Sequence, residues 1–192
     1  MSSAITTYTG KHFDPLHPDP QAILIEDIAH ALSLLCRGNG HVQSFWSVAQ
    51  HCLCCAEEAS ARNLPDRMVL ACLLHDAGEC YLSDIPRPFK QALPQYRKSE
   101  DALLELIYTK FLGSPLSPQE QSLLQEIDDA MLWFDLSLLL HETPSQPKPV
   151  LHIDLDYSFR PFQEVERAYL DVFYRHSGTP GPAAPLPCRR KP

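Results

Sequence analysis

Three short segments of the chain place metal-ligating side chains among apolar neighbours. They are Ser47–His51 (SVAQH), Leu73–Glu79 (LLHDAGE) and Glu126–Met131 (EIDDAM). An ionised carboxylate in such surroundings is costly unless a partner compensates its charge. A divalent cation would compensate several of these groups at once. The residue types therefore favour a metal centre built from side chains that lie far apart in the sequence.

Two imidazoles and two carboxylates would make a mixed nitrogen and oxygen site for one divalent metal ion. Mn²⁺, Co²⁺, Fe²⁺, Ni²⁺, Zn²⁺ and Mg²⁺ all stay open as its identity. Four protein ligands leave coordination positions for water and a phosphate oxygen, and a metal there would activate the water and polarise phosphorus. Periodicity does not decide between Asp128 and Asp129, because the segment around them is apolar on several sides.

Apolar residues at helical spacing predict the elements that must position these groups. The expected helices cover about 22–36, 43–62, 97–112, 117–141 and 162–176, and a further helix runs from about 65 to Ala77 in the LLHDAGE segment. Pro86 and Pro88 predict a stiff loop between the third and fourth of them. No convincing alternating strand is found, although 150–156 could form a short one. The predicted fold class is all-α, a compact bundle of six or seven helices.

Composition bounds the remaining possibilities. The 192 residues suggest one domain over 1–176 and a Pro-rich disordered tail over 177–192. The net charge of −8 argues against binding to a nucleic acid polymer. No apolar run is long enough to span a membrane, and no signal peptide is recognised, so we expect a cytoplasmic protein.

The seven cysteines do not suggest a disulfide framework, since their number is odd. Cys52 and Cys55 have CxxC spacing, but a structural zinc site would need a second such pair, and the sequence has none. We therefore interpret them as small buried helix residues. The adjacent acids Glu57 and Glu58 are interpreted as a solvated helix face.

The ordered set of motifs resembles the HD-domain phosphohydrolases, in particular the bacterial 5′-deoxynucleotidase branch and its phage-type relatives. The resemblance rests on SVAQH, LLHDAGECYLSDIPRPFK and DDAML, together with IEDIAHALSLLCRGNGH, and it covers about residues 5–176. It implies an HD-domain helical bundle with His51, His75, Asp76 and Asp129 as metal ligands. Asp129 is chosen because the second Asp of DDAML matches the family ligand. The absence of histidine between residues 77 and 128 favours one metal ion over two.

The resemblance also implies roles for three charged residues. Glu79 resembles the catalytic glutamate that orients or deprotonates the attacking water. Asp84 occupies the loop position that contacts substrate and assists proton transfer. Arg37 resembles the arginine that orients the phosphate, since a guanidinium can bind two phosphate oxygens.

Further substrate-binding positions follow from the same comparison. Ile85, Pro86 and Arg87 continue the substrate-binding loop, and Lys90 is a second phosphate contact. Gly38 stands where relatives usually carry an aromatic residue near the sugar, so this chain lacks that ring. Phe45 or Trp46 would have to supply a replacement.

We therefore expect a metal-dependent phosphohydrolase that removes the 5′-phosphate from (deoxy)nucleoside monophosphates, with an activated water as nucleophile. A dNTP triphosphohydrolase that releases triphosphate is the alternative, because Arg87 adds positive charge for a longer phosphate chain. A non-catalytic nucleotide-binding HD module is a third possibility, which Glu79 and Asp84 count against. The expected partners are a small nucleotide and a second copy of the chain in a homodimer, with no membrane.

Overall fold

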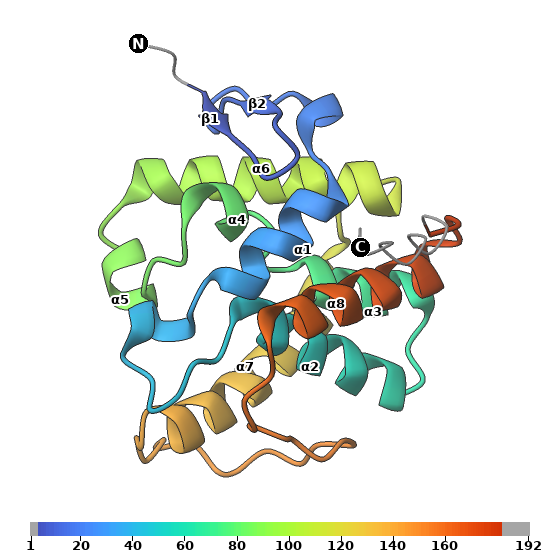
Figure 1. Cartoon of the computed structure of the whole chain (residues 1–192). Helices are drawn as coiled ribbons and strands as arrows, with labels where there is room; N and C mark the ends of the chain where they lie inside the picture. Colours follow the sequence, from blue (N-terminus) through green and yellow to red (C-terminus); the bar gives the residue numbers. More distant parts are fainter. Residues whose placement is uncertain (1–3, 182–192) are drawn as a thin grey trace, which may run out of the picture.

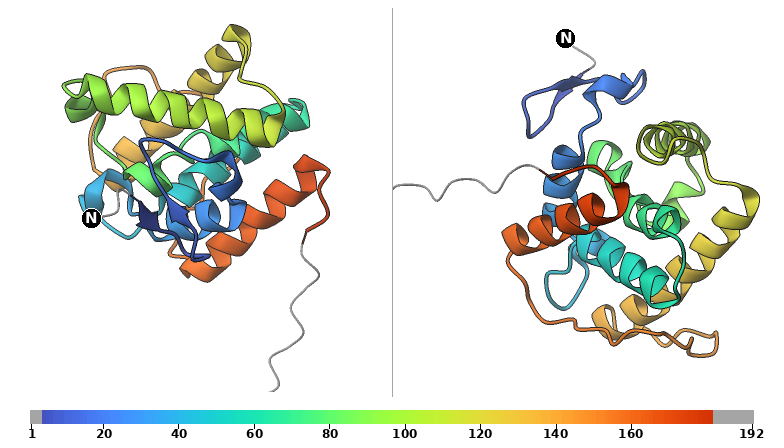
Figure 2. Two further views of the ribbon diagram at one scale, coloured as in Figure 1. Left: turned by 90° about the horizontal axis from the view of Figure 1, so that it is seen from above. Right: turned by 90° about the vertical axis from the view of Figure 1, so that its right-hand side faces the viewer.

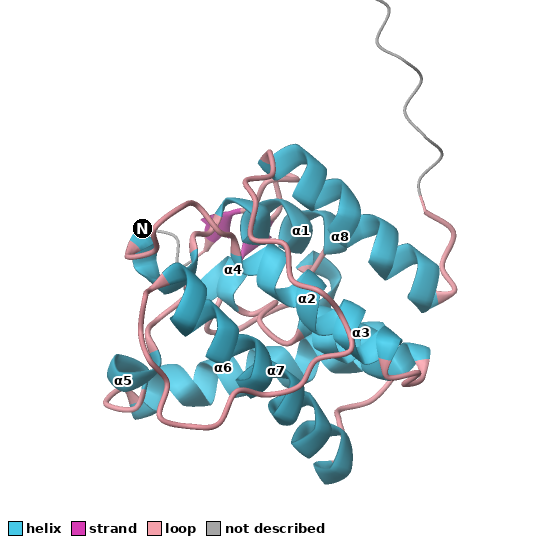
Figure 3. Cartoon of the chain, turned by 90° about the horizontal axis from the view of Figure 1, so that it is seen from below, coloured by secondary structure: helices cyan, strands magenta, loops and turns pink. Residues whose placement is uncertain are grey.

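The computed structural model describes residues 4–181, and most of them are helical (Figures 1 and 3). Six helices in this range have nine residues or more, so the predicted all-α bundle is confirmed. The elements are η1 (Pro20–Ala22), α1 (Ile25–Leu34), η2 (Arg37–Gly40), α2 (Val48–Ala61), α3 (Asp66–Leu74), α4 (Glu79–Leu82), α5 (Arg87–Lys90), α6 (Pro94–Leu112), α7 (Pro118–Leu139) and α8 (Phe162–Ser177). From residue 182 on, the predicted tail lies outside the described residues.

A small hairpin in the N-terminal arm was not predicted. Its strands β1 (Ile5–Thr6) and β2 (His12–Phe13) pair antiparallel, with Ile5 opposite Phe13. Strands of two residues are too short to produce a readable alternation of polar and apolar positions. The segment 150–156, by contrast, forms no strand.

The helices α2 and α3 form the centre of the bundle. They pack against each other, and α8 contacts both of them together with α1 (Figure 1). On the other side α7 contacts α2 and α3, and α6 packs against α3 (Figure 2). The predicted apolar stripes are buried here, including Ile28 and Leu32 of α1 and Val69 and Leu73 of α3. Among residues 4–181, no helix is both long and apolar enough to cross a membrane.

Hydrogen-bonded caps explain where α7 and α2 begin. Ser117 and Glu120 form a capping box at the start of α7. Ser47 and Gln50 form a second box, which begins α2 five residues later than the periodicity predicted. The backbone N–H of Arg37 donates to the carbonyl of Trp46 at 2.8 Å, so the preceding residues close into a loop instead of helix.

The third helix also ends earlier than predicted, at Leu74. The backbone N–H of Ala77 bonds to the carbonyl of Leu74 at 2.9 Å, and that of Glu79 bonds to Asp76 at 3.0 Å. These are i to i+3 bonds, which tighten the chain into a turn at the end of the helix. The His75–Asp76 pair therefore sits at the carboxyl end of α3, and Glu79 begins a separate short helix.

A long connection between α7 and α8 runs across one face of the molecule (Figure 3). It is anchored on α2 by Glu58, whose side chain is fully buried. The Glu58 carboxylate accepts hydrogen bonds from Arg62 Nε at 2.8 Å and from the backbone N–H of His152 at 2.8 Å. The interpretation of this acid as a solvated residue was therefore wrong, although its neighbour Glu57 is exposed.

We expect Glu58→Gln to lower the free energy of unfolding by about 1–3 kcal/mol at pH 7, because it weakens buried hydrogen bonds between charged groups. Burial raises the pKa of Glu58, but Arg62 and His152 outweigh burial and hold this pKa below its usual value. A carboxyl with a lowered folded pKa stabilises the fold above its unfolded pKa of about 4.3 and loses that contribution as the pH falls.

Urea unfolding of the wild-type and variant proteins would test this at pH 7 and in acid. The difference between them should shrink as the pH falls below about 4. Glu57→Gln is the matched control on the same helix and should change stability by less than about 0.5 kcal/mol. Equal effects of the two substitutions would refute the anchoring role of Glu58.

Candidate metal centre

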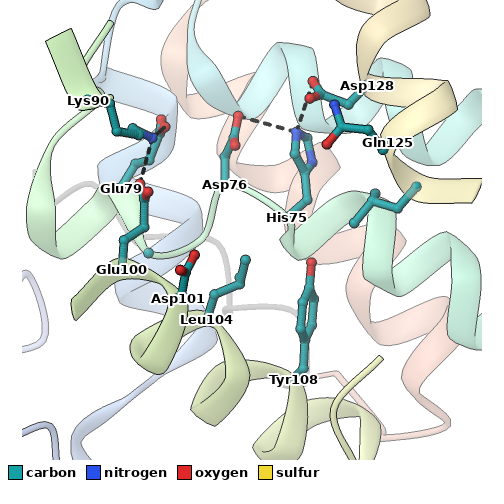
Figure 4. Close-up of a pocket in the computed structure, with 12 residues that line it drawn as sticks. His75, Asp76, Glu79, Lys90, Glu100, Asp101, Leu104, Tyr108, Gln125 and Asp128 are labelled. Atoms are coloured by element: carbon teal, nitrogen blue, oxygen red, sulfur yellow. Dashed lines mark hydrogen bonds and ion pairs between the residues drawn. The ribbon is translucent and has the colours of Figure 1, made fainter. Parts of the chain in front are cut away.

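Side chains from α2, α7 and the end of α3 meet at one buried point. His51 Nε2 lies 3.1 Å from Asp128 Oδ1, and His75 Nε2 lies 3.6 Å from the same oxygen. Asp76 Oδ2 lies 3.3 Å from His75 Nε2 (Figure 4). Three of the four predicted ligands, His51, His75 and Asp76, are thus brought together. These donors form groups that could hold a metal ion.

Each histidine is oriented through its other ring nitrogen. Nδ1 of His51 lies 2.9 Å from Asp135 Oδ2, and Nδ1 of His75 lies 2.7 Å from the carbonyl oxygen of Cys72. Both partners are acceptors, so each Nδ1 carries a proton. This is the arrangement usual for metal-ligating histidines, because it fixes the ring and directs Nε2 to the metal. Nε2 of His75 is buried and makes no hydrogen bond among the described residues.

The prediction of Asp129 as the fourth ligand requires correction. Its side chain is 53 % exposed and contacts Arg87 and Gln125, whereas that of Asp128 is 19 % exposed and faces the histidines. Neighbouring helix residues point roughly 100° apart, so only one of the two acids can face inward. The structure therefore places Asp128 in the position that the motif assigned to Asp129.

Asp135 is a site residue that the sequence reasoning missed. It follows Asp128 by seven residues on α7, a separation of two helical turns that keeps both acids on one face. Besides His51, its carboxylate accepts from Arg37 Nη2 at 3.3 Å and from the Tyr157 hydroxyl at 2.9 Å. That spacing was the available signal. Tyr157, from the α7–α8 connection, could not be foreseen from it.

Two thiols of α2, those of Cys52 and Cys55, also lie beside the histidines and acids of this centre. The donor atoms of His51, Cys55, His75 and Asp128 all lie within 4.8 Å of one another, and those of Cys52, His75 and Asp76 form a second group. Both sulfurs are buried. The prediction that these cysteines are small buried residues is correct, but it overlooked what lies beside them.

The charges of the site depend on one another. Burial alone would raise the pKa of Asp128, but its hydrogen bond to His51 and the charge of His75 hold that pKa well below its usual value. Burial also opposes ionisation of Asp76, and the neighbouring charges of His75 and Arg37 lower its pKa in spite of this. Both carboxylates are therefore ionised at neutral pH.

Glu79 behaves differently from these two acids. It is 5 % exposed, and burial raises the pKa of its carboxyl well above the usual value, with further increases from Asp76 and Asp84. One oxygen has no hydrogen-bond partner among the described residues, and the other lies 3.7 Å from Lys90 Nζ. Lys90 itself is held by Glu100 at 2.6 Å (Figure 4). A carboxyl with a raised pKa is suited to accept and return a proton.

Asp84 and Arg37 are two further charged residues near Glu79. Burial raises the pKa of Asp84, and Asp76 adds to the increase, while Arg37 and Lys90 oppose it. Arg37 donates to Asp76 at 3.4 Å and to Asp135 at 3.3 Å. The guanidinium therefore links the metal-ligand group to the acid that orients His51.

A cavity of about 540 Å³ opens beside these charged residues. All six residues predicted to bind substrate line it, namely Arg37, Gly38, Ile85, Pro86, Arg87 and Lys90. Asp76, Glu79, Asp84 and Asp128 line it too, so it reaches the candidate metal centre. A smaller cavity of about 200 Å³ lies on the other side of Glu79, between His75 and Tyr108 (Figure 4).

Part of the lining of the larger cavity is aliphatic. It is formed by Val42, Leu132, Leu136, Leu139 and Leu140, and the described lining includes no Phe, Tyr or Trp. Trp46 is buried against Tyr157, with ring centroids 4.6 Å apart, and does not supply a replacement ring. At Gly38, φ is +58°, a conformation that a side chain would strain, so this turn favours glycine.

Comparison with known proteins gives relatives that are themselves named as uncharacterized. The chain is 33 % identical over 175 residues to RCAP_rcc00048 of Rhodobacter capsulatus, which covers 84 % of this chain and 89 % of that protein. It is 40 % identical over 111 residues to YfdR of Escherichia coli K12, a match that spans 57 % of this chain and only 58 % of the relative. No family model matches the chain.

Paired substitutions of the adjacent acids test the geometry of the centre. We expect Asp128→Asn to weaken Co²⁺ or Zn²⁺ binding at least 10- to 100-fold, since even partners that only orient metal ligands are worth that much. Asp129→Asn should leave the affinity within about a factor of two, because its side chain points away. Isothermal titration of the two metal-free variants would measure this. The reverse ranking would restore Asp129 as the ligand.

Proposed function

We propose a function for a chain that belongs to the same protein family as RCAP_rcc00048 of Rhodobacter capsulatus: metal-dependent hydrolysis of the 5′-phosphate of (deoxy)nucleoside monophosphates. The observation that carries the proposal is the convergence of His51, His75 and Asp128 next to a cavity that is lined by Asp128 and by a buried carboxyl, Glu79. The order of the motifs, which resembles the HD-domain phosphohydrolases, supports the same assignment.

The donor set fits a divalent metal ion. His51, His75, Asp76 and Asp128 would hold it, and Nε2 of His75, buried without a hydrogen bond 3.3 Å from Asp76 Oδ2, is the polar atom that such an ion would satisfy. When bound, the ion supplies Lewis acidity toward a phosphate oxygen and lowers the pKa of water. Nitrogen and carboxylate ligands suit Mn²⁺, Co²⁺, Fe²⁺, Ni²⁺ and Zn²⁺, with Mg²⁺ less favoured by the imidazoles.

Two acids of the chain would handle protons. We assign to Glu79 the role of accepting a proton from the attacking water, because its raised pKa lets it alternate between charged and neutral forms. We assign to Asp84 the donation of a proton to the leaving 5′-oxygen, since burial raises its pKa as well. Hydrolysis then breaks the phosphorus–oxygen ester bond and yields a nucleoside and inorganic phosphate.

The lining of the cavity offers charged residues for the phosphate of a nucleotide and apolar residues for its nucleoside. Arg37 and Lys90 provide positive charge beside the acids, where the phosphate would be oriented. Leu132, Leu136 and Leu140 provide apolar surface for the nucleoside. Without an aromatic ring at Gly38, the site lacks a stacking contact to the sugar, which favours weak discrimination between deoxyribose and ribose.

A dNTP triphosphohydrolase is the second candidate. Arg87 favours it, because this half-exposed side chain lies 3.6 Å from Asp128 at the cavity wall and adds a third cation for a longer phosphate chain. In either case we infer an enzyme of small nucleotides that acts in the cytoplasm. The carboxyls of Glu79 and Asp84 count against a merely binding module, since binding a metal does not require them.

A screen of metals against nucleotides tests the proposal. The protein would be stripped with chelator, reloaded with Mn²⁺, Co²⁺, Ni²⁺, Zn²⁺ or Mg²⁺, and given matched dNMP, NMP and dNTP sets. We expect orthophosphate from the monophosphates with at least one metal. A His75→Ala preparation controls for contaminating phosphatases. Intact triphosphate from dNTPs would select the second candidate, and no turnover with any metal would overturn both.

Glu79→Gln should separate chemistry from metal binding. Losing a general acid–base group costs roughly 10²–10⁴-fold in rate, so we expect kcat to fall by at least about 10²-fold. Metal content should stay the same, because Glu79 does not belong to the grouped donors. Glu105→Gln, on the exposed side of α6, is the matched control and should leave kcat unchanged. If Glu79→Gln also emptied the site, Glu79 would have to be a ligand.

A further inference from the structure

We propose that Cys55 is a sulfur ligand of the metal centre. The inference rests on the metal site of the proposed function and adds to it a donor that the His and Asp motifs do not include. It follows from the position of one thiol relative to both histidines.

The sulfur of Cys55 lies within reach of the same point as the other donors. Cys55 Sγ is 3.7 Å from His51 Nε2, and it belongs to the group in which His51, His75 and Asp128 all lie within 4.8 Å of one another. Donor atoms that share one zinc-sized ion lie roughly 3–4 Å apart, because their bonds to the ion are about 2.0–2.3 Å long. The separation of the sulfur and the nitrogen therefore fits shared coordination.

The local fold supplies this arrangement. Cys55 follows His51 by four residues on α2, so the two side chains lie on one face of the helix, one turn apart. Cys55 is fully buried, as is the ring of His51. The buried Nε2 of His75, which has no hydrogen-bond partner among the described residues, is a second and independent sign that an ion belongs here.

The other nearby thiol fits less well. Cys52 is grouped with His75 and Asp76, a group that includes neither His51 nor Asp128. An ion placed among His51, His75 and Asp128 therefore has the thiol of Cys55, and not that of Cys52, in the same group of donors.

Coordination by Cys55 has a chemical consequence. The sulfur–metal bond forms as the thiol releases its proton to solvent, with no change of oxidation state. A thiolate favours Zn²⁺ and Co²⁺, and it disfavours the hard ions Mn²⁺ and Mg²⁺. The centre should therefore select the softer metals more strongly than a site of two histidines and two carboxylates.

Co²⁺ absorption spectroscopy on the full chain tests this without any turnover. We expect stoichiometric Co²⁺ to produce a thiolate-to-cobalt charge-transfer band in the near ultraviolet. The band should vanish in Cys55→Ala and persist in Cys52→Ala, the matched buried thiol on the same helix. Cys55→Ala should also lose Co²⁺ affinity by at least 10- to 100-fold while losing much less for Mn²⁺. Far-ultraviolet circular dichroism of both variants checks that each is folded.

The outcomes are separable from those of the proposed function. Co²⁺ binding without a thiolate band, or a band that is lost in Cys52→Ala and kept in Cys55→Ala, overturns the role of Cys55 alone. If Cys55→Ala is misfolded, persistence of the band in Cys55→Ser, which keeps the size of the side chain, overturns it equally. A thiolate band in a protein that hydrolyses no nucleotide would support Cys55 and overturn the phosphohydrolase assignment. Failure to bind Co²⁺ at all would overturn the role of Cys55, and turnover with another metal would then keep the phosphohydrolase assignment.

Discussion

Negative charge concentrated inside the bundle is the constraint on which the rest of the site depends. Asp76, Glu79, Asp84, Asp128 and Asp135 gather where α2, α7 and the end of α3 meet, and most of their surface is withdrawn from water. Buried carboxylates of like charge cannot all ionise without compensation. Arg37 and the two histidines compensate part of this charge through short contacts. A bound cation would compensate the remainder at the point where the donor atoms are closest.

The fold meets this constraint by ending its elements at the site. Because α3 stops at Leu74, the next two side chains project beyond the helix instead of packing along it. The loop before α2 is closed by a hydrogen bond from the backbone N–H of Arg37 to the carbonyl of Trp46. The guanidinium of Arg37 reaches Asp76 and Asp135 from this loop. Most of the remaining helix surface is ordinary apolar packing around α2 and α3. The rigid bundle thus positions a charged centre that would be unstable on a flexible chain.

Sequence alone predicts the fold class and most of the long helices, since apolar spacing is set by burial on one face. Boundaries were less predictable, because the capping box at Ser47 and the tight turn after Leu74 depend on hydrogen bonds that periodicity does not report. The motif brought His51 and His75 to the site but selected Asp129, which the direction of α7 turns outward. Tertiary contacts decide such one-residue differences. Glu58 illustrates the same limit, because its partner His152 lies 94 residues away.

The cavity is lined by charged residues and by aliphatic ones, and both kinds determine how a ligand must lie in it. An anionic group placed on the aliphatic side would lose its hydration without gaining a partner, which costs several kcal/mol. Near Arg37 and Lys90 the same group finds donors, and the carboxyls of Glu79 and Asp128 line the same cavity. The leucines of α7 then contact the other end of the ligand by shape and apolar area, without a directional hydrogen bond. For the nucleotide proposed as substrate, charged contacts to the phosphate would therefore fix the orientation, while the aliphatic residues would leave the choice of base permissive.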